Sequence, residues 1–419
     1  MKRLKVNIAL MILWGVVLSA ATKAQDNYTP LPPYLDGSMM PYDFSSASSV
    51  YLPDSLTPVY ASYIARHGSR YLSGPVKLQP VVDALQEGRR AGTLSETGEA
   101  FFTLVNKIKK ANEGNWGDLS PKGYAEENIL ARRLFSLLNP LDRKGLKVNA
   151  VSSYMPRCVM TMYLFTHGLI RENDFLMTRT DEGHQFEPLL CCFMADRAFA
   201  DFRKVGKWKE IYRKYEESYV SPEPARRLFT QTDLNESELR RLTFDMYEVL
   251  KANRAAGLPA PTTQWMSVRE YEGCWQASNL QHYLRNTVSP VSDLAGKATA
   301  PLLEKIISDI DIAAQSDSPE IILNGYFGHA ETLLPLLSLM KLAGCYDDSE
   351  NYSRLGNIWK IQNITPLAAN LTILLSRTPS GRKYVSMQLN GKSIRPIQGE
   401  PEFVLWTELR KYWLDLLKG

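Results

Sequence analysis

The residues most able to do chemistry lie in the segment 59–71, VYASYIARHGSRY, where a histidine stands between two arginines. The planar guanidinium of arginine pairs with two oxygens of a carboxylate or a phosphate. Positive charge nearby disfavours the imidazolium form, so we expect His67, between Arg66 and Arg70, to be neutral and able to act as a nucleophile. Gly68 lets the backbone pass close to a bound group. The segment predicts an anion site; a solvated surface loop is the alternative interpretation.

Two further segments carry complementary groups. SSYMPR ends in Arg157, and GHAE places His329 and Glu331 at the start of a predicted helix, where free N–H groups favour phosphate. Three arginines can hold the oxygens of a phosphoryl group with His329 as a further donor, while Glu331 protonates the leaving alcohol. The same carboxylate can then activate the water that hydrolyses a phosphohistidine. We expect burial and a bound polyanion to raise the pKa of Glu331 once substrate is present. Arg157 has an alternative interpretation as an ordinary surface arginine.

The scheme requires no metal ion or other cofactor. No two histidines have the spacing of an H-E-x-x-H motif. We expect His184 and His282 to be structural or surface residues and His167, after an apolar helix face, to be a packed or capping histidine. The number of cysteines is odd, and their spacing shows no paired zinc-type motif. One or two disulfides are possible, and buried thiols are the alternative. These cysteines are Cys158, Cys191, Cys192, Cys274 and Cys345.

Three predicted strands carry these groups to one place. Apolar runs predict strands at 59–65, 146–151 and 320–327, and residues with helical periodicity follow each of them. In open α/β sheets, ligands bind where the carboxyl ends of the strands converge. Late in the chain, Asn390 and Gly391 predict the tight turn of a hairpin. The fold class is therefore α/β, with a central, mostly parallel sheet flanked by helices.

The chain divides into a predicted core and a predicted insertion. We assign residues 25–165 and 294–419 to the α/β core and residues 166–293 to an α-helical cap in which no strand is expected. The basic helix at 197–214 can line a cleft for a highly phosphorylated substrate or simply form a solvated face. Its basic residues are Arg203, Lys204, Lys207, Lys209, Arg213 and Lys214.

Residues 1–24 have the layout of a cleaved secretory signal. Basic residues precede an apolar run too short to span a membrane. Small residues follow it at Ser19, Ala20, Ala21 and Ala24, with cleavage expected near Ala21 to Ala24. We therefore expect an exported protein, periplasmic or secreted, with no membrane insertion after cleavage. Removing Lys2, Arg3, Lys5 and Lys23 leaves 45 of the 49 basic groups against 45 acidic ones. A neutral chain lacks the field that grips nucleic acid, so an anion must be bound by a local cluster.

The motifs RHGSR and GHAE resemble those of the histidine phosphatase superfamily. GHAE is similar to the variant found in the multiple inositol polyphosphate phosphatases, where most related acid phosphatases and phytases carry HD. The order of the elements also matches, from RHGSR through LSPKG and SSYMPR to GHAE and the late hairpin. The resemblance implies a nucleophile, a proton donor and four phosphate ligands. The nucleophile would be His67 and the proton donor Glu331. The four phosphate ligands would be Arg66, Arg70, Arg157 and His329.

The resemblance further implies a metal-independent phosphomonoesterase that hydrolyses inositol polyphosphates, including phytate, through a phosphohistidine. Its partners would be small phosphate esters. Two alternatives are an acid phosphatase acting on sugar phosphates and a phosphate-binding protein that has lost turnover; the complete set of His67, His329 and Glu331 argues against the second. The chain departs from the family after its third arginine, where Cys158 and Thr161 replace the usual small residues. This departure changes packing behind the site without removing a charged group.

Overall fold

The computed structural model describes residues 28–45, 52–138 and 145–418. The predicted signal peptide, 1–24, lies outside the described residues. Eight strands form one sheet in the order β3-β2-β4-β1-β5-β6-β7, with β8 paired to β6. The strands are β1 (Thr57–Arg66), β2 (Lys147–Ser152), β3 (Met177–Glu182), β4 (Ile321–Gly328), β5 (Asn370–Arg377), β6 (Lys383–Leu389), β7 (Lys392–Ile394) and β8 (Val404–Leu405).

The three strands that lead to the predicted site lie side by side and are parallel. β4 lies between β2 and β1, and β3 extends this parallel half beyond β2, whereas β5 to β8 are antiparallel. In the register, Arg66 is opposite Gly328 and Ser152 is opposite Phe327. Their carboxyl ends are therefore level, which confirms the mostly parallel α/β sheet and the meeting of its strand ends.

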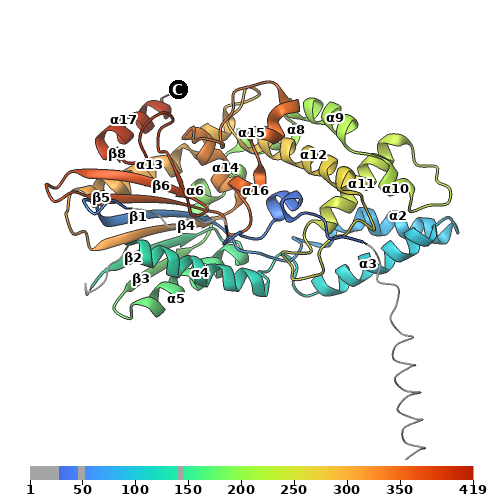
Figure 1. Ribbon diagram of the computed structural model, residues 1–419, viewed down its shortest axis with the longest axis horizontal. Coiled ribbons are helices and arrows are strands. Elements are labelled where there is room, and N and C mark those ends of the chain that lie inside the picture. Colours follow the sequence, from blue (N-terminus) through green and yellow to red (C-terminus); the bar gives the residue numbers. More distant parts are fainter. Residues whose placement is uncertain (1–27, 46–51, 139–144, 419) are drawn as a thin grey trace, which may run out of the picture.

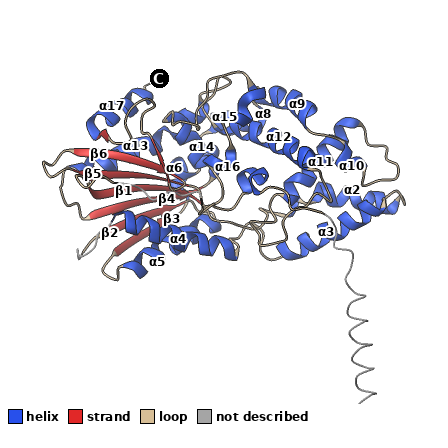
Figure 2. Cartoon of the chain, in the orientation of Figure 1, coloured by secondary structure: helices blue, strands red, loops and turns tan. Residues whose placement is uncertain are grey.

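Helices cover both faces of the sheet (Figure 2). On one face Tyr63 packs with Leu130 and Phe165, and on the other Tyr60 packs with Leu303 and Leu333. Tyr60 and Tyr63 can point to opposite faces because side chains alternate along a strand. The helices of this layer are α4 (Pro121–Leu138), α5 (Pro156–Glu172), α13 (Leu294–Ala314), α14 (Ala330–Leu339) and α17 (Trp406–Leu416).

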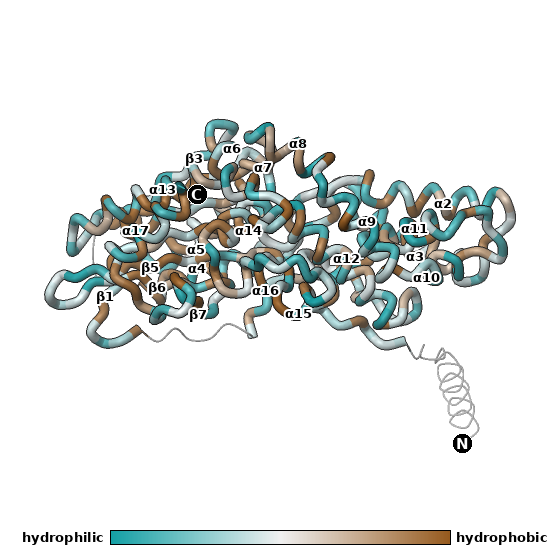
Figure 3. The backbone as a smooth tube through the Cα atoms, turned by 90° about the horizontal axis from the view of Figure 1, so that it is seen from above, coloured by the Kyte–Doolittle hydropathy of each residue, from teal (hydrophilic) through white to brown (hydrophobic). Residues whose placement is uncertain are grey.

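A second, all-helical region lies at the other end of the elongated molecule (Figures 1 and 3). Its core joins Leu35 of the N-terminal arm to Leu85 and Phe101 and to Tyr247 and Tyr271. The helices that build this region or lead to it are η1 (Pro33–Met39), η2 (Pro75–Lys77), α2 (Gln79–Arg90), α3 (Glu96–Asn112), η3 (His184–Phe186), α6 (Glu187–Leu190), α7 (Cys192–Ala195), α8 (Arg197–Val205), α9 (Trp208–Tyr219), α10 (Glu223–Arg226), α11 (Glu236–Leu250) and α12 (Val268–Asn286). Short helices η4 (Tyr352–Arg354), α15 (Leu355–Ile358) and α16 (Ile361–Ile364) follow α14.

Two features of this arrangement differ from the sequence-based expectation. The prediction that no strand occurs within residues 166–293 is wrong, because β3 pairs with β2 at the edge of the sheet. As an edge strand, β3 exposes residues on both faces and has no apolar alternation to reveal it. In addition, α2 and α3, which we assigned to the core segment 25–165, pack in the helical region. The domain boundaries at 165 and 293 stay a prediction.

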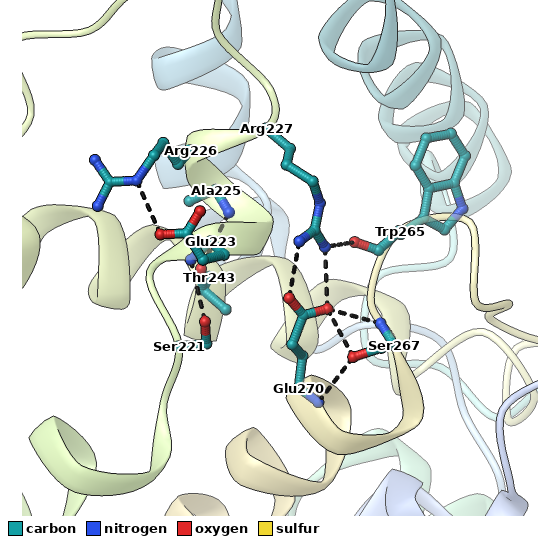
Figure 4. Close-up of polar contacts among 9 residues, drawn as sticks. All are labelled: Ser221, Glu223, Ala225, Arg226, Arg227, Thr243, Trp265, Ser267 and Glu270. Carbon is teal, nitrogen blue, oxygen red and sulfur yellow. Dashed lines mark hydrogen bonds and ion pairs between the residues drawn. The ribbon is translucent and has the colours of Figure 1, made fainter.

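Charged contacts fix the ends of helices within the helical region (Figure 4). Arg227, just after α10, donates hydrogen bonds to both carboxylate oxygens of Glu270, at 2.8 and 3.0 Å. Glu270 also accepts from the backbone of Ser267, whose hydroxyl caps α12. The carboxylate of Glu270 therefore takes part both in the N-terminal cap of α12 and in a bidentate ion pair with Arg227. These contacts hold the start of α12 against the turn that follows α10.

The predicted hairpin is confirmed at Asn390 and Gly391, which have φ angles of 52° and 73° between β6 and β7. No helix in the described ranges has the length and apolarity that crossing a bilayer requires.

Candidate active site

The backbone of His67 is held on both sides at the end of β1. Its N–H donates to Gly328 of β4, and its carbonyl accepts from Ala368 just before β5, both at 3.0 Å. The ring Nδ1 lies 3.0 Å from the Gly68 carbonyl oxygen, which can only accept, so Nδ1 carries the proton. Burial and the arginines around it hold the pKa of His67 well below its usual value. The imidazole is therefore neutral, with a free lone pair on Nε2.

The three predicted arginines gather around this ring. Arg66 is buried and donates from one nitrogen to the carbonyls of Ser38 (2.6 Å) and Thr365 (2.7 Å). Burial, with Arg157 next to it, lowers the pKa of Arg66 to about 10 and that of Arg70 to about 9. The Nε atoms of all three guanidinium groups are buried and have no hydrogen-bond partner in the part of the chain that the structure describes. A buried donor without an acceptor is costly, so this cluster fits a multivalent oxyanion.

His329 connects Arg157 to the end of β4. Its Nδ1 lies 3.4 Å from a terminal nitrogen of Arg157, and its Nε2 lies 3.2 Å from the hydroxyl of Ser153. Burial and Arg157 lower the pKa of His329 to about 3, so the ring is neutral. Because Arg157 can only donate, Nδ1 accepts and Nε2 carries the proton. Arg157 thus lies at the predicted site and is not an ordinary surface arginine.

Glu331 lies in the first turn of α14. Burial by itself raises its pKa, but Arg203 and then His329 lower it, and the result is a pKa of about 2. A terminal nitrogen of Arg203 donates to Glu331 over 3.2 Å. The expected rise in the pKa of Glu331 concerns the substrate-bound protein and stays a prediction.

Arg203 comes from the predicted basic helix at 197–214, which the structure divides into α8 and α9 with a break at Gly206. A role of this stretch in substrate binding stays a prediction. Arg203 turns inward from α8, whereas Lys204, Lys209 and Arg213 are exposed. The periodicity of the sequence placed these residues on a helix, but it did not show which of them faces the site. Of the remaining histidines, His282 is partly buried, and its charge affects the pKa of Glu331.

The atypical positions Cys158 and Thr161 pack behind the loop of residues 67–70, the predicted catalytic loop. The hydroxyl of Thr161 accepts from the N–H of Gly68 at 3.2 Å. The thiol of Cys158 lies 3.2 Å from the carbonyl of Gly328 and 3.6 Å from Nε2 of His329. The five cysteines are all free and buried, which decides the open question in favour of buried thiols.

Sequence reasoning missed a support on α4. Glu126 accepts from the N–H and the hydroxyl of Ser69, both at 2.7 Å, and so fixes the loop between His67 and Arg70. A Cβ on Gly123 would lie 2.2 Å from the Ser69 carbonyl oxygen, so α4 can approach the loop only with glycine there. Acidic residues on the buried face of a predicted helix were the available signal.

The comparisons agree with this geometry. A family model described as "Histidine phosphatase superfamily (branch 2)" matches residues 60–390. The chain is 24% identical to multiple inositol polyphosphate phosphatase 1 of Gallus gallus over 410 residues, covering 89% of this chain and 85% of the relative. It is 25% identical to the protein of the same name in Homo sapiens, covering 88% of this chain and 81% of that one.

Solved structures share the fold. The Bifidobacterium longum multiple inositol polyphosphate phosphatase in complex with inositol hexasulfate has a TM-score of 0.75 at 17% identity, covering 90% of this chain and 97% of that one. The phytase from D. castellii has a TM-score of 0.69 at 15% identity, covering 92% and 85%.

Proposed function

Because this chain belongs to branch 2 of the histidine phosphatase superfamily, we propose that it is a phosphomonoesterase acting on inositol polyphosphates, phytate included. The observation that carries the proposal is the set of three guanidinium groups around a neutral imidazole, each with a buried Nε that has no hydrogen-bond partner among the described residues. The choice of inositol polyphosphates is supported by the names of the vertebrate relatives and of the bacterial structure with the same fold.

In the first step, we propose, Nε2 of His67 attacks phosphorus and the bond from phosphorus to the ester oxygen breaks. The leaving alkoxide takes a proton from the carboxyl group of Glu331, so the products are phosphohistidine, the free alcohol and a carboxylate. Arg66, Arg70 and Arg157 hold the phosphoryl oxygens, with His329 as a further phosphate ligand. This step requires Glu331 to be protonated when the substrate is bound.

In the second step, the carboxylate of Glu331 removes a proton from water, and the oxygen of that water attacks the phosphohistidine. The bond from phosphorus to His67 breaks, inorganic phosphate leaves, and both side chains return to their initial states. No other protein group has to gain or lose a proton over the cycle.

Export is also proposed, on the sequence of residues 1–24 alone. A neutral mature chain and the absence of a membrane-spanning helix in the described ranges are compatible with it.

The substrate class is tested by comparing kcat/KM for phytate and for glucose 1-phosphate on the purified mature chain. We expect a clear preference for phytate, which would decrease as salt is added because the substrate is a polyanion. A preference for the sugar phosphate would instead establish a broad acid phosphatase. Turnover of neither ester, with phosphate still bound, would establish a binding protein.

A further inference from the structure

Arg203 is built to contact the proton donor. Its side chain is 13% exposed, and it donates from Nε to Asn286 over 2.9 Å and from a terminal nitrogen to Glu331 over 3.2 Å. The guanidinium also lies over the ring of Phe193, 5.0 Å from its centroid. Phe193 in turn contacts His329, with 5.5 Å between the ring centroids. The ring of Phe193 therefore lies between Arg203 and His329, a predicted phosphate ligand.

This ion pair conflicts with the proposed chemistry. A general acid needs its proton when the alcohol leaves, but a guanidinium donating to a carboxylate favours the ionised form. The wild-type chain must therefore weaken this contact before the first step. An arriving phosphate group can do so, because it is a strong acceptor for arginine and because its negative charge repels the carboxylate.

We infer that Arg203 is a positioning residue that keeps Glu331 ionised before substrate binds and then turns to the substrate, so that the proton donor is loaded only in the complex. This inference rests on the proposed function. The proton comes from solvent or from the phosphate monoanion itself. Glu331 is therefore ionised in the enzyme without substrate, and it takes up one proton each time a substrate molecule binds.

Other charged groups face Glu331 from the elements packed around it. His329 and Arg66 lie on the sheet side, and His282 and Arg285 lie on α12. Burial lowers the pKa of His282 and of His329 to about 3, so bound anions can also draw protons onto these rings. A test must therefore separate the proton on Glu331 from protons on histidine.

Sulfate binding provides that separation, because sulfate brings no proton of its own near pH 4. Calorimetry in buffers of different ionisation enthalpy gives the number of protons taken up on binding. Proton uptake is compared within two pairs of proteins. The first pair is the wild type and Glu331→Gln, and the second is Arg203→Gln and the double variant that carries both substitutions. Within each pair, the difference in proton uptake is the part that depends on Glu331. At about pH 4 we expect about one proton for the wild-type pair and a small fraction of that for the Arg203→Gln pair. In the Arg203→Gln protein, Glu331 is already protonated in most molecules before sulfate binds.

Arg197→Gln is the matched control, since it removes an arginine from the same helix whose side chain is 95% exposed. It should behave as wild type, and Arg203→Lys should restore part of the uptake. Equal Glu331-dependent uptake with and without Arg203, or none in the wild type while sulfate binds, would overturn the role of Arg203 alone. If sulfate did not bind to the wild type, the phosphate site and the proposed function would fall together.

Discussion

The two sides of the site are built in different ways. The sheet side consists of groups that follow closely on the ends of parallel strands, where backbone hydrogen bonds between neighbouring strands hold Arg66 and His67 in place. The cap side consists of groups held by side-chain contacts between helices. The sheet side comprises Arg66, His67, Arg70, Arg157 and His329. The cap side comprises Arg203, His282, Arg285 and Asn286. Glu331 lies between the two and contacts Arg203 across the site.

This difference indicates that the sheet side of the site is rigid and that the cap side can change its contacts. A strand ladder cannot shift by one residue without disturbing its neighbours, so the strand ends keep their spacing, and with them the predicted phosphate ligands that follow. The cap side can exchange partners, because a guanidinium bound by side chains alone can rotate. The following experiments sharpen or break this distinction.

The largest effect is expected for His67→Ala, which removes the nucleophile from the sheet side. We expect turnover to fall by roughly 10⁴-fold or more. Wild-type protein mixed with radiolabelled substrate and quenched in acid should carry labelled phosphate, and the variant should carry none. Label that persisted on the variant would place the covalent intermediate elsewhere.

Glu331→Gln tests the group between the two sides. We expect hydrolysis of an inositol phosphate to slow by about 10²–10⁴-fold, because its alkoxide needs a proton to leave. Hydrolysis of 4-nitrophenyl phosphate should slow much less, since nitrophenolate leaves without one. Comparing kcat for the two esters measures the difference, and equal losses would mean that Glu331 is not the acid.

Thr161→Val probes the packing behind the sheet side. The substitution keeps the shape but leaves the buried N–H of Gly68 without an acceptor, which should cost about 1–3 kcal/mol of stability. Urea unfolding measures this loss, and kcat should fall with it because the catalytic loop loses a fixed point. Thr161→Ser keeps the hydroxyl and serves as the control. Unchanged stability in the valine variant would show that the contact with Gly68 contributes nothing.

His282→Gln should have the smallest effect at neutral pH, and it tests the cap side through the response to acid. Burial lowers the pKa of His282 to about 3, so between that value and the ordinary 6.5 the unfolded chain binds a proton that the folded chain does not. Acid therefore lowers the wild-type free energy of unfolding by up to about 1.4 kcal/mol per pH unit from this residue alone.

The glutamine variant should lose that part of the pH dependence between pH 6.5 and about 4. Urea unfolding at several pH values measures the slope. His167→Gln is the matched control, since His167 is exposed. A slope that stayed the same in His282→Gln would mean that this ring is not buried in its neutral form.

The same distinction explains how much the sequence could predict. Every catalytic and phosphate-binding position that we inferred lies at the end of a parallel strand or within five residues after it, where a short motif follows an apolar run. For that reason the sheet-side groups were found together with their strands. Arg203 and His282 have no motif around them, because their roles depend on how distant helices pack.

Two elements escaped prediction for physical reasons of their own. β3 is an exposed edge strand without a periodic pattern, and β5 is a short, almost fully buried run whose antiparallel pairing with β1 depends on residues 300 positions away. Glu126 and Gly123 escaped because their importance arises from one close approach between α4 and the catalytic loop. Such contacts are properties of the assembled fold.

The bridge that Arg66 makes has a consequence for the order of synthesis. Its guanidinium joins the carbonyl of Ser38 to that of Thr365, and the next residue, His67, has its carbonyl fixed by Ala368. A growing chain therefore presents its nucleophile early, but it cannot fix that nucleophile in place until Ala368 has been made. A chain cut after Glu331 would contain all the named reactive groups and still be unable to assemble the site.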